Sequence, residues 1–187
     1  MGLGFSLLQD GDVDLLTEML SEREILRNLK SLTYPYARET AVAFVREIQA
    51  QKILGLAALE GTNESGKSCW GLTYQGRLVG TLGFRIGQGV EEGDFTLGYW
   101  LGKDYWGQGI ATQAVERACR WALGPARARR ISAHVFAWNP ASSRVLEKNG
   151  FQLEGCRRKA VVRFGEVTDL LTYGLLPEDF QTTKMKA

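Results

Sequence analysis

Two stretches of the sequence have the glycine spacing of loops that hold phosphate groups. One of them reads Trp106-Gly107-Gln108-Gly109-Ile110-Ala111-Thr112 and joins a strand-forming run at 95–101 to a helix-forming run that begins at residue 110. Glycines let the backbone approach a ligand, and the free amides of a first helical turn point outward with the positive end of the helix dipole. A dinucleotide fingerprint would need a further glycine where Thr112 stands. We therefore expect the amides of residues 107–112 to bind a pyrophosphate.

The other stretch satisfies the nucleotide-triphosphate pattern G-x-x-x-x-G-K-S/T with Gly61-Thr62-Asn63-Glu64-Ser65-Gly66-Lys67-Ser68. In such a loop the lysine and serine open a long helix. Here the residues that follow, 69–74, are strand formers and lead into a turn at Gly76. We expect a polar glycine and serine loop before a hairpin. Nucleotide hydrolysis is kept as an alternative, in which Lys67→Ala would abolish activity.

A third segment places a serine and an asparagine at the start of an expected helix. It reads Trp138-Asn139-Pro140-Ala141-Ser142-Ser143-Arg144-Val145-Leu146-Glu147-Lys148-Asn149-Gly150-Phe151. Asn139 suits the N-cap position and Pro140 the first helical position, while Gly150 ends the helix. The segment therefore presents Ser142 in the first turn.

The lone histidine and the three cysteines do not have the spacing of a metal site or a disulfide framework. Cys69, Cys119 and Cys156 lie far apart, and His134 is the single histidine. We expect reduced thiols and no metal. His134 lies in an alternating strand pattern, which favours a half-exposed strand residue over a catalytic one.

The loop at 106–112 and the segment at 138–151, in this order and spacing, resemble the GCN5-related N-acetyltransferase (GNAT) superfamily. The cofactor loop of that family reads Q/R-x-x-G-x-G/A, and its second block reads N-x-x-S-x-x-v-x-E-K-x-G-F. The chain is more narrowly similar to the RimJ/RimL-type branch of ribosomal-protein N-terminal acetyltransferases. Residues 97–101 and the early Tyr34-Pro35-Tyr36 fit the same branch, so the resemblance covers most of the chain.

The resemblance implies acetyl-coenzyme A as the cofactor and assigns roles to individual residues. The pantetheine arm would bind the backbone of Tyr99, Trp100 and Leu101, and the pyrophosphate would bind the loop at 107–112. Asn139 would contact the cofactor arm. Ser142 would lie near the thioester sulfur and protonate the leaving thiolate, so Ser142 and Asn139 are the expected catalytic residues.

Three positions depart from the family pattern. Trp106 replaces the first Gln or Arg of the cofactor loop, and Leu146 stands where many relatives have a tyrosine that acts as the general acid. Thr96 stands where a strand glutamate often acts as the general base. The base is therefore open between water and the nearby carboxylates Asp94, Glu91 and Glu92.

The missing base affects which acceptor is expected. An α-amine titrates near 7.7–8.0 and a lysine near 10.4, so lysine needs roughly 3.5 kcal/mol more help to lose its proton. We therefore expect transfer of an acetyl group to a protein or peptide N-terminus. A small-molecule amine (a polyamine, an amino acid or an antibiotic) is the alternative acceptor, and a non-catalytic acyl-coenzyme A-binding module is the alternative function.

Hydrophobic periodicity predicts the elements that position these residues. Strands are expected at 5–8, 70–74, 78–86, 95–101, 131–137, 152–162 and 167–175, and helices within 12–51 and at 110–123 and 140–149. This is an α/β (α+β) chain. With the resemblance, it implies a mixed, mostly antiparallel central sheet, flanked by helices and splayed at the cofactor site. We expect a single acetyltransferase domain over 1–187, with the acceptor side at 12–51, the cofactor core at 70–151 and C-terminal strands at 152–175.

The composition limits the partners. The chain has 187 residues, 44% of them hydrophobic, with a net charge of +2, and no apolar run approaches the roughly 20 residues of a membrane span. We expect a cytoplasmic protein without a membrane or nucleic-acid partner, as a monomer or homodimer. The basic clusters at 127–130 and 157–159 are expected to be solvated faces, with the 3′-phosphate of coenzyme A or ribosomal RNA as alternative partners.

Overall fold

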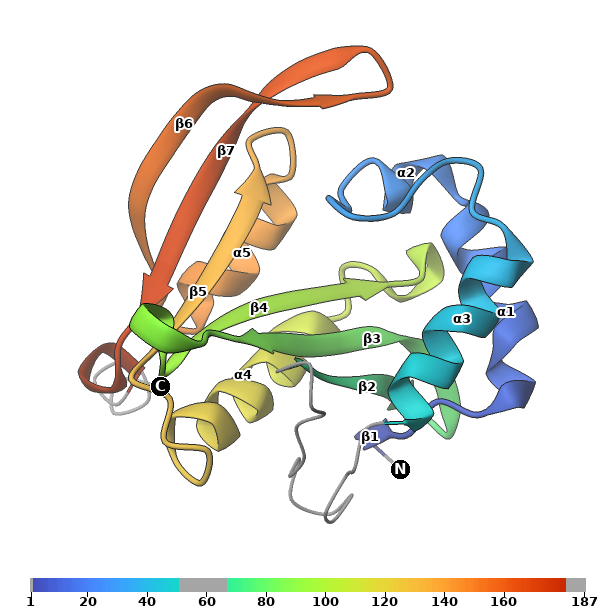
Figure 1. The fold of residues 1–187 in the computed structure, drawn as a ribbon, viewed down its shortest axis with the longest axis horizontal. Coiled ribbons are helices and arrows are strands. Elements are labelled where there is room, and N and C mark those ends of the chain that lie inside the picture. The colour runs from blue at the N-terminus through green and yellow to red at the C-terminus, as the bar shows by residue number, and fades with distance from the viewer. Residues whose placement is uncertain (1, 51–66, 181–187) are drawn as a thin grey trace.

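Seven strands form one mixed sheet in the computed structural model, which describes residues 2–50 and 67–180 (Figure 1). They are β1 (Leu3–Ser6), β2 (Lys67–Tyr74), β3 (Arg77–Ile86), β4 (Asp94–Leu101), β5 (Arg130–Phe136), β6 (Gln152–Arg163) and β7 (Glu166–Leu175). Their order is β1-β2-β3-β4-β5-β7-β6, and each neighbouring pair is antiparallel except β4 and β5. The expected mixed, mostly antiparallel sheet is confirmed.

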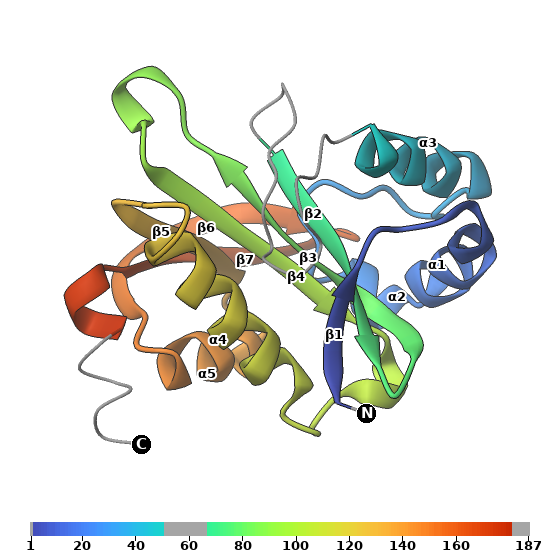
Figure 2. The same ribbon diagram turned by 90° about the horizontal axis from the view of Figure 1, so that it is seen from below.

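Helices lie on both faces of this sheet (Figure 2). They are α1 (Val13–Ser21), α2 (Arg23–Leu26), α3 (Arg38–Gln49), α4 (Ile110–Leu123) and α5 (Pro140–Lys148). One buried apolar cluster joins α4 to the sheet, and a second gathers α1, α2 and α3 on the opposite face. None of the helices within the described ranges has the length and apolarity needed to cross a membrane.

Several sequence expectations at the N-terminus need correction. The first strand lies at Leu3–Ser6 and not at 5–8, because its ladder with β2 ends at Ser6 and Leu8 joins the buried cluster of α1, α2 and α3. Within the helical region expected at 12–51, residues 23–29 form only the short α2, and Leu29 lies in the loop that follows it. Residues 61–66 of the nucleotide-loop pattern lie outside the described residues, but the chain from Lys67 forms β2 and not the helix that such a loop requires.

Strands β4 and β5 separate after four residue pairs. Their parallel ladder runs from Asp94 opposite Arg130 to Leu97 opposite Ala133, and Figure 1 shows the two strands diverging beyond it. On its other side, β4 stays paired with β3 as far as Leu101. The backbone of residues 98–101 therefore has no strand partner on the side that faces β5, which is the expected splay.

The α4 layer is anchored by an aromatic cluster around Trp121. Its ring meets Trp70 edge-on at 5.5 Å between centroids and lies 6.0 Å from Phe84 and 6.3 Å from Phe95. We expect Trp121→Ala to lower the free energy of unfolding by about 3–5 kcal/mol, because it leaves a cavity in the core. Thermal unfolding followed by circular dichroism should show a fall in Tm of about 10 °C or more.

Trp121→Phe is the matched control for this prediction. It keeps most of the apolar area and removes an indole N–H that has no hydrogen-bond partner within the described part of the chain. Its fall in Tm should therefore be much smaller. An alanine variant as stable as the wild type would contradict the anchoring role of this cluster.

Candidate active site

A cavity of about 880 Å³ lies at the splay between β4 and β5. On one side it is lined by the loop before α4 and by the first turns of α4 and α5. On the other side it is lined by α2, the loop after α2 and the open face of β3. The cavity therefore connects both layers of the fold through the gap in the sheet.

The glycine loop enters the cavity at the start of α4. Gly107 and Gly109 have φ values of 73° and 76°, which favour glycine, and Gly109 is the N-cap of α4. A Cβ built on either glycine would meet nothing within 4 Å, so the backbone is open to a ligand. Ile110, Ala111 and Thr112 form the first turn of α4, whose amides have no carbonyl partner inside the helix. This geometry fits the pyrophosphate site expected from the sequence.

Trp106 and Gln108 use their side chains to hold this loop. Trp106 Nε1 donates to the carbonyl of Leu101 at 2.9 Å, which ties the loop to the end of β4. Gln108 Nε2 donates to the carbonyl of Asp104 at 2.8 Å. Trp106 therefore has a structural role at the position where the family pattern has Gln or Arg.

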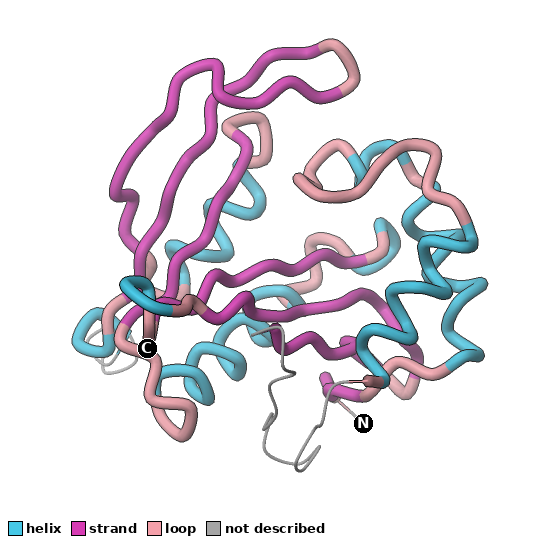
Figure 3. The backbone as a smooth tube through the Cα atoms, in the orientation of Figure 1, coloured by secondary structure: helices cyan, strands magenta, loops and turns pink. Residues whose placement is uncertain are grey.

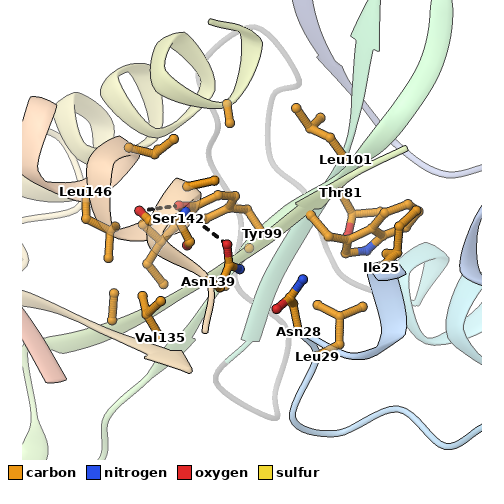
Figure 4. Close-up of a pocket in the computed structure, with 18 of the residues that line it drawn as sticks. Ile25, Asn28, Leu29, Thr81, Tyr99, Leu101, Val135, Asn139, Ser142 and Leu146 are labelled. Carbon is orange, nitrogen blue, oxygen red and sulfur yellow. Dashed lines mark hydrogen bonds between the residues drawn. The ribbon is translucent and has the colours of Figure 1, made fainter. Parts of the chain in front are cut away.

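Ser142 and Tyr99 form a hydroxyl pair at the centre of the cavity (Figure 4). The Tyr99 hydroxyl lies 2.8 Å from Ser142 Oγ. Asn139 Oδ1 accepts the Ser142 backbone amide at 3.2 Å, so the N-cap interpretation of Asn139 is confirmed, and Asn139 also lines the cavity. The sequence analysis predicted that Ser142 and Asn139 lie close together. It did not predict that the Tyr99 side chain reaches Ser142 on α5 from β4.

Burial raises the pKa of Tyr99 to about 12, and the hydrogen bond with Ser142 opposes that change. The Tyr99 hydroxyl therefore stays protonated through the physiological range. It can donate to Ser142 Oγ while Ser142 donates to a ligand atom in the cavity. Leu146 is buried nearby and supplies no acidic group.

Alternate residues of β4 face opposite layers. Leu97 and Leu101 belong to the α4 cluster and Tyr99 packs against it, whereas Trp100 packs against the N-terminal cluster. Thr96 and Gly98 share the parity of Trp100 and line the cavity from the N-terminal side. All three residues assigned to the pantetheine arm, Tyr99, Trp100 and Leu101, line the same cavity.

The tip of the β6–β7 hairpin reaches the loop after α2, and Figure 3 shows these two segments near one another beyond the end of β5. Arg163 donates to the carbonyls of Leu26 and Leu32. Arg27 pairs with Glu166 at 2.6 Å, and Tyr34 meets the ring of Phe164 edge-on. These contacts hold the loop after α2, which lines the N-terminal side of the cavity, and no local sequence pattern indicated them.

Every formally charged residue that lines the cavity is a cation, within the parts of the chain that the structure describes. These residues are Lys30, Arg85, Arg144 and Lys148.

None of the three carboxylates considered as bases lines the cavity. Asp94 accepts from Ser132 at 2.8 Å and pairs with Arg130, Glu91 lies 3.6 Å from Arg85, and Glu92 is exposed.

The mixed sheet splays beside the N-terminus of α4, which follows a glycine-containing loop, and this arrangement is that of an acyl-coenzyme A-binding fold. Comparisons with known proteins lead to the same class. The family model "Acetyltransferase (GNAT) domain" matches residues 3–152. The chain therefore belongs to the GNAT acetyltransferase family.

Individual relatives point the same way. The chain is 40% identical over 107 residues, 56% of its length and 59% of the relative's, to "Probable N-acetyltransferase YjcK" of Bacillus subtilis. It spans about three-fifths of the length of the first curated relatives that it matches.

Two solved structures share the fold at low sequence identity. One is RimL, a ribosomal L7/L12 alpha-N-protein acetyltransferase in complex with coenzyme A, with a TM-score of 0.76 at 21% identity, covering 94% of both chains. The other is spermidine N-acetyltransferase from Vibrio cholerae in complex with CoA and spermine, with a TM-score of 0.77 at 16% identity, covering 96% of this chain and 98% of that one.

Proposed function

We propose that this chain transfers the acetyl group of acetyl-coenzyme A to the α-amine of a protein or peptide N-terminus. The observation that carries this proposal is the cavity that holds both the glycine loop at the start of α4 and the Ser142 and Tyr99 hydroxyl pair. The loop amides would bind the pyrophosphate, and the free backbone of β4 would bind the pantetheine arm. Ser142 would then lie at the thioester end of the cofactor.

In this reaction, the acceptor nitrogen attacks the acetyl carbonyl carbon and the carbon–sulfur bond breaks. The unpaired amides of β4 would stabilise the oxyanion that forms, because they are fixed before the reaction begins. The pKa of the Tyr99 hydroxyl, about 12, is well above the value near 8.5 of a thiol, so net proton transfer from Tyr99 to the leaving thiolate is unfavourable. Ser142 and Tyr99 would therefore stabilise the leaving thiolate mainly by hydrogen bonding.

The charge of the cavity supports an α-amine over a polyamine. A polyamine carries several positive charges and would meet Lys30 and Arg85 on the acceptor side, where no carboxylate lines the described part of the cavity. An α-amine is about one-quarter neutral at pH 7.4, so it can enter uncharged. The likeness to the spermidine enzyme shows the fold alone.

The test measures thiol release from acetyl-coenzyme A with three acceptor sets: peptides with a free N-terminus, the same peptides with a blocked N-terminus and an internal lysine, and polyamines. We expect release only with free N-termini, and faster release when acidic residues follow the first residue. Release only with lysines or polyamines would overturn the α-amine assignment. Cofactor binding without release from any acceptor would favour a non-catalytic acyl-coenzyme A-binding module.

The same proposal includes the wider organisation of the chain. We propose that 1–187 acts as one acetyltransferase domain, supported by the single continuous sheet. The exposed free thiol of Cys156 suits a reducing compartment such as the cytoplasm. A monomer or a homodimer remains the expected state.

A further inference from the structure

The proposed reaction needs a group that accepts a proton, and the described lining of the cavity contains no carboxylate. When a neutral amine becomes an amide, its nitrogen loses one proton as the new carbon–nitrogen bond forms. Water can take that proton, but a positioned base typically makes proton transfer 10²- to 10⁴-fold more effective. His134 is the one imidazole in the chain and lines this cavity.

His134 lies at the point where the sheet opens. The last residue pair between β4 and β5 is Leu97 opposite Ala133, so His134 is the first residue of β5 beyond the ladder and Gly98 is the corresponding residue of β4. Its neighbours Ala133 and Val135 are buried in the α4 cluster, so the exposed His134 faces the other side, on which the acceptor would enter. A Cβ on Gly98 would meet nothing within 4 Å, which leaves open space beside the imidazole.

We propose that His134 is the general base of the acetyl transfer, a role that rests on the proposed function. The Thr172 hydroxyl on β7 lies 3.5 Å from His134 Nδ1, which leaves Nε2 for the acceptor. Nε2 takes the proton of the attacking nitrogen directly or through one water, the carbon–sulfur bond breaks, and the thiolate gains one proton through Ser142 or solvent. One proton is released and one is taken up, so no further reactant is needed.

The groups around His134 keep the imidazole neutral, as a base must be. Partial burial of the ring lowers the pKa of His134, and three cations lower it further: Lys30 after α2, Arg157 on β6 and Arg85 on β3. Asp94 on β4 acts in the opposite direction with a smaller effect, and Thr172 on β7 is uncharged. The imidazole is therefore unprotonated at neutral pH and able to accept a proton.

The test compares wild type with His134→Gln over a range of pH, using a peptide with a free N-terminus as the acceptor. We expect His134→Gln to lower kcat/KM about 10²-fold or more at pH 7.5. In the wild type, log kcat/KM should fall with a slope of about 2 below the imidazole pKa, because both the amine and His134 become protonated, whereas the variant should keep a slope of about 1. Exogenous imidazole should restore part of the activity of His134→Ala.

Two further measurements separate a base from a merely structural residue. Since the chain has one histidine, its NMR titration should give a single imidazole pKa below 6.5, and Lys30→Gln should raise both that pKa and the pH at which the slope changes. The Kd for acetyl-coenzyme A should be unchanged in His134→Gln. A His134→Gln variant with near wild-type kcat/KM, or with the wild-type slope, would overturn the proposal.

An error in the acceptor assignment can be distinguished from an error in the role of His134. If another amine replaces N-terminal peptides as the acceptor, the same pH series with that amine still tests His134. Turnover of no amine would contradict the proposed function. A His134 resonance that titrates at or above 6.5 and does not shift when acetyl-coenzyme A binds would separately contradict the placement of this residue.

Discussion

Replacing Ser142 with alanine lowers kcat about 10²-fold while leaving the Kd for acetyl-coenzyme A unchanged, which is the expected result if its hydroxyl acts on the leaving sulfur. The substitution removes the Oγ that lies 2.8 Å from the Tyr99 hydroxyl but keeps the backbone amide that Asn139 accepts. The first turn of α5 should therefore stay in place. Thiol release at saturating acceptor gives kcat, and calorimetric titration gives the cofactor Kd.

Ser143→Ala is the matched control, because it removes a hydroxyl from the next position of α5, outside the pair. It should retain wild-type kcat. Unchanged turnover in Ser142→Ala would remove Ser142 from the mechanism and leave solvent as the source of the thiol proton.

A Tyr99→Phe variant shows whether the two hydroxyls act together. If Tyr99 acts by polarising Ser142, the double variant should be no slower than Ser142→Ala alone, so the effects of the two changes will not add. With the Tyr99 pKa raised to about 12, its ionisation adds no alkaline limb to the activity profile at physiological pH. Additive losses would instead mean that the two hydroxyls contact the cofactor independently.

The parts of the site that could be predicted from sequence are those made by short, continuous segments. The loop at 106–112 contains its own helix start, its glycines and its amides, so local spacing is sufficient to indicate an anion site. Asn139 and Ser142 are three residues apart in one helical turn, and the expected cap is observed. The alternation around His134 predicted a half-exposed strand residue and not a catalytic one, and His134 is exposed on β5.

The contacts that could not be predicted join segments far apart in the chain. Tyr99 reaches Ser142 across 43 residues, because the β4 and β5 ladder ends after Leu97 and α5 packs behind the gap. The loop that lines the N-terminal side of the cavity is held by Arg163, which reaches the carbonyl of Leu26 across 137 residues. The hydrophobic periodicity of one segment does not indicate its contacts with a distant segment. For the same reason, the position of His134 where β4 and β5 separate could not be predicted.

If the amine reaches the thioester past His134, as proposed, a side chain at Gly98 should block it. Gly98 lies on β4 at the first position beyond the ladder, on the face opposite α4, and a Cβ there would enter open space. Its φ lies outside the left-handed region, so a larger residue can adopt the strand backbone without strain.

We expect Gly98→Leu to lower kcat/KM for the acceptor about 10²-fold or more, because the isobutyl group occupies the space through which the amine reaches the thioester. Gly98→Ala adds only a methyl group and should lose much less. Because the side chain at 98 points away from the glycine loop, the Kd for acetyl-coenzyme A should stay near that of wild type in both variants.

If Gly98→Leu retained full transfer activity, the acceptor would have to enter by another route, and His134 would no longer lie on its path. If the variant instead lost cofactor binding, the cofactor would occupy the face that we assign to the amine.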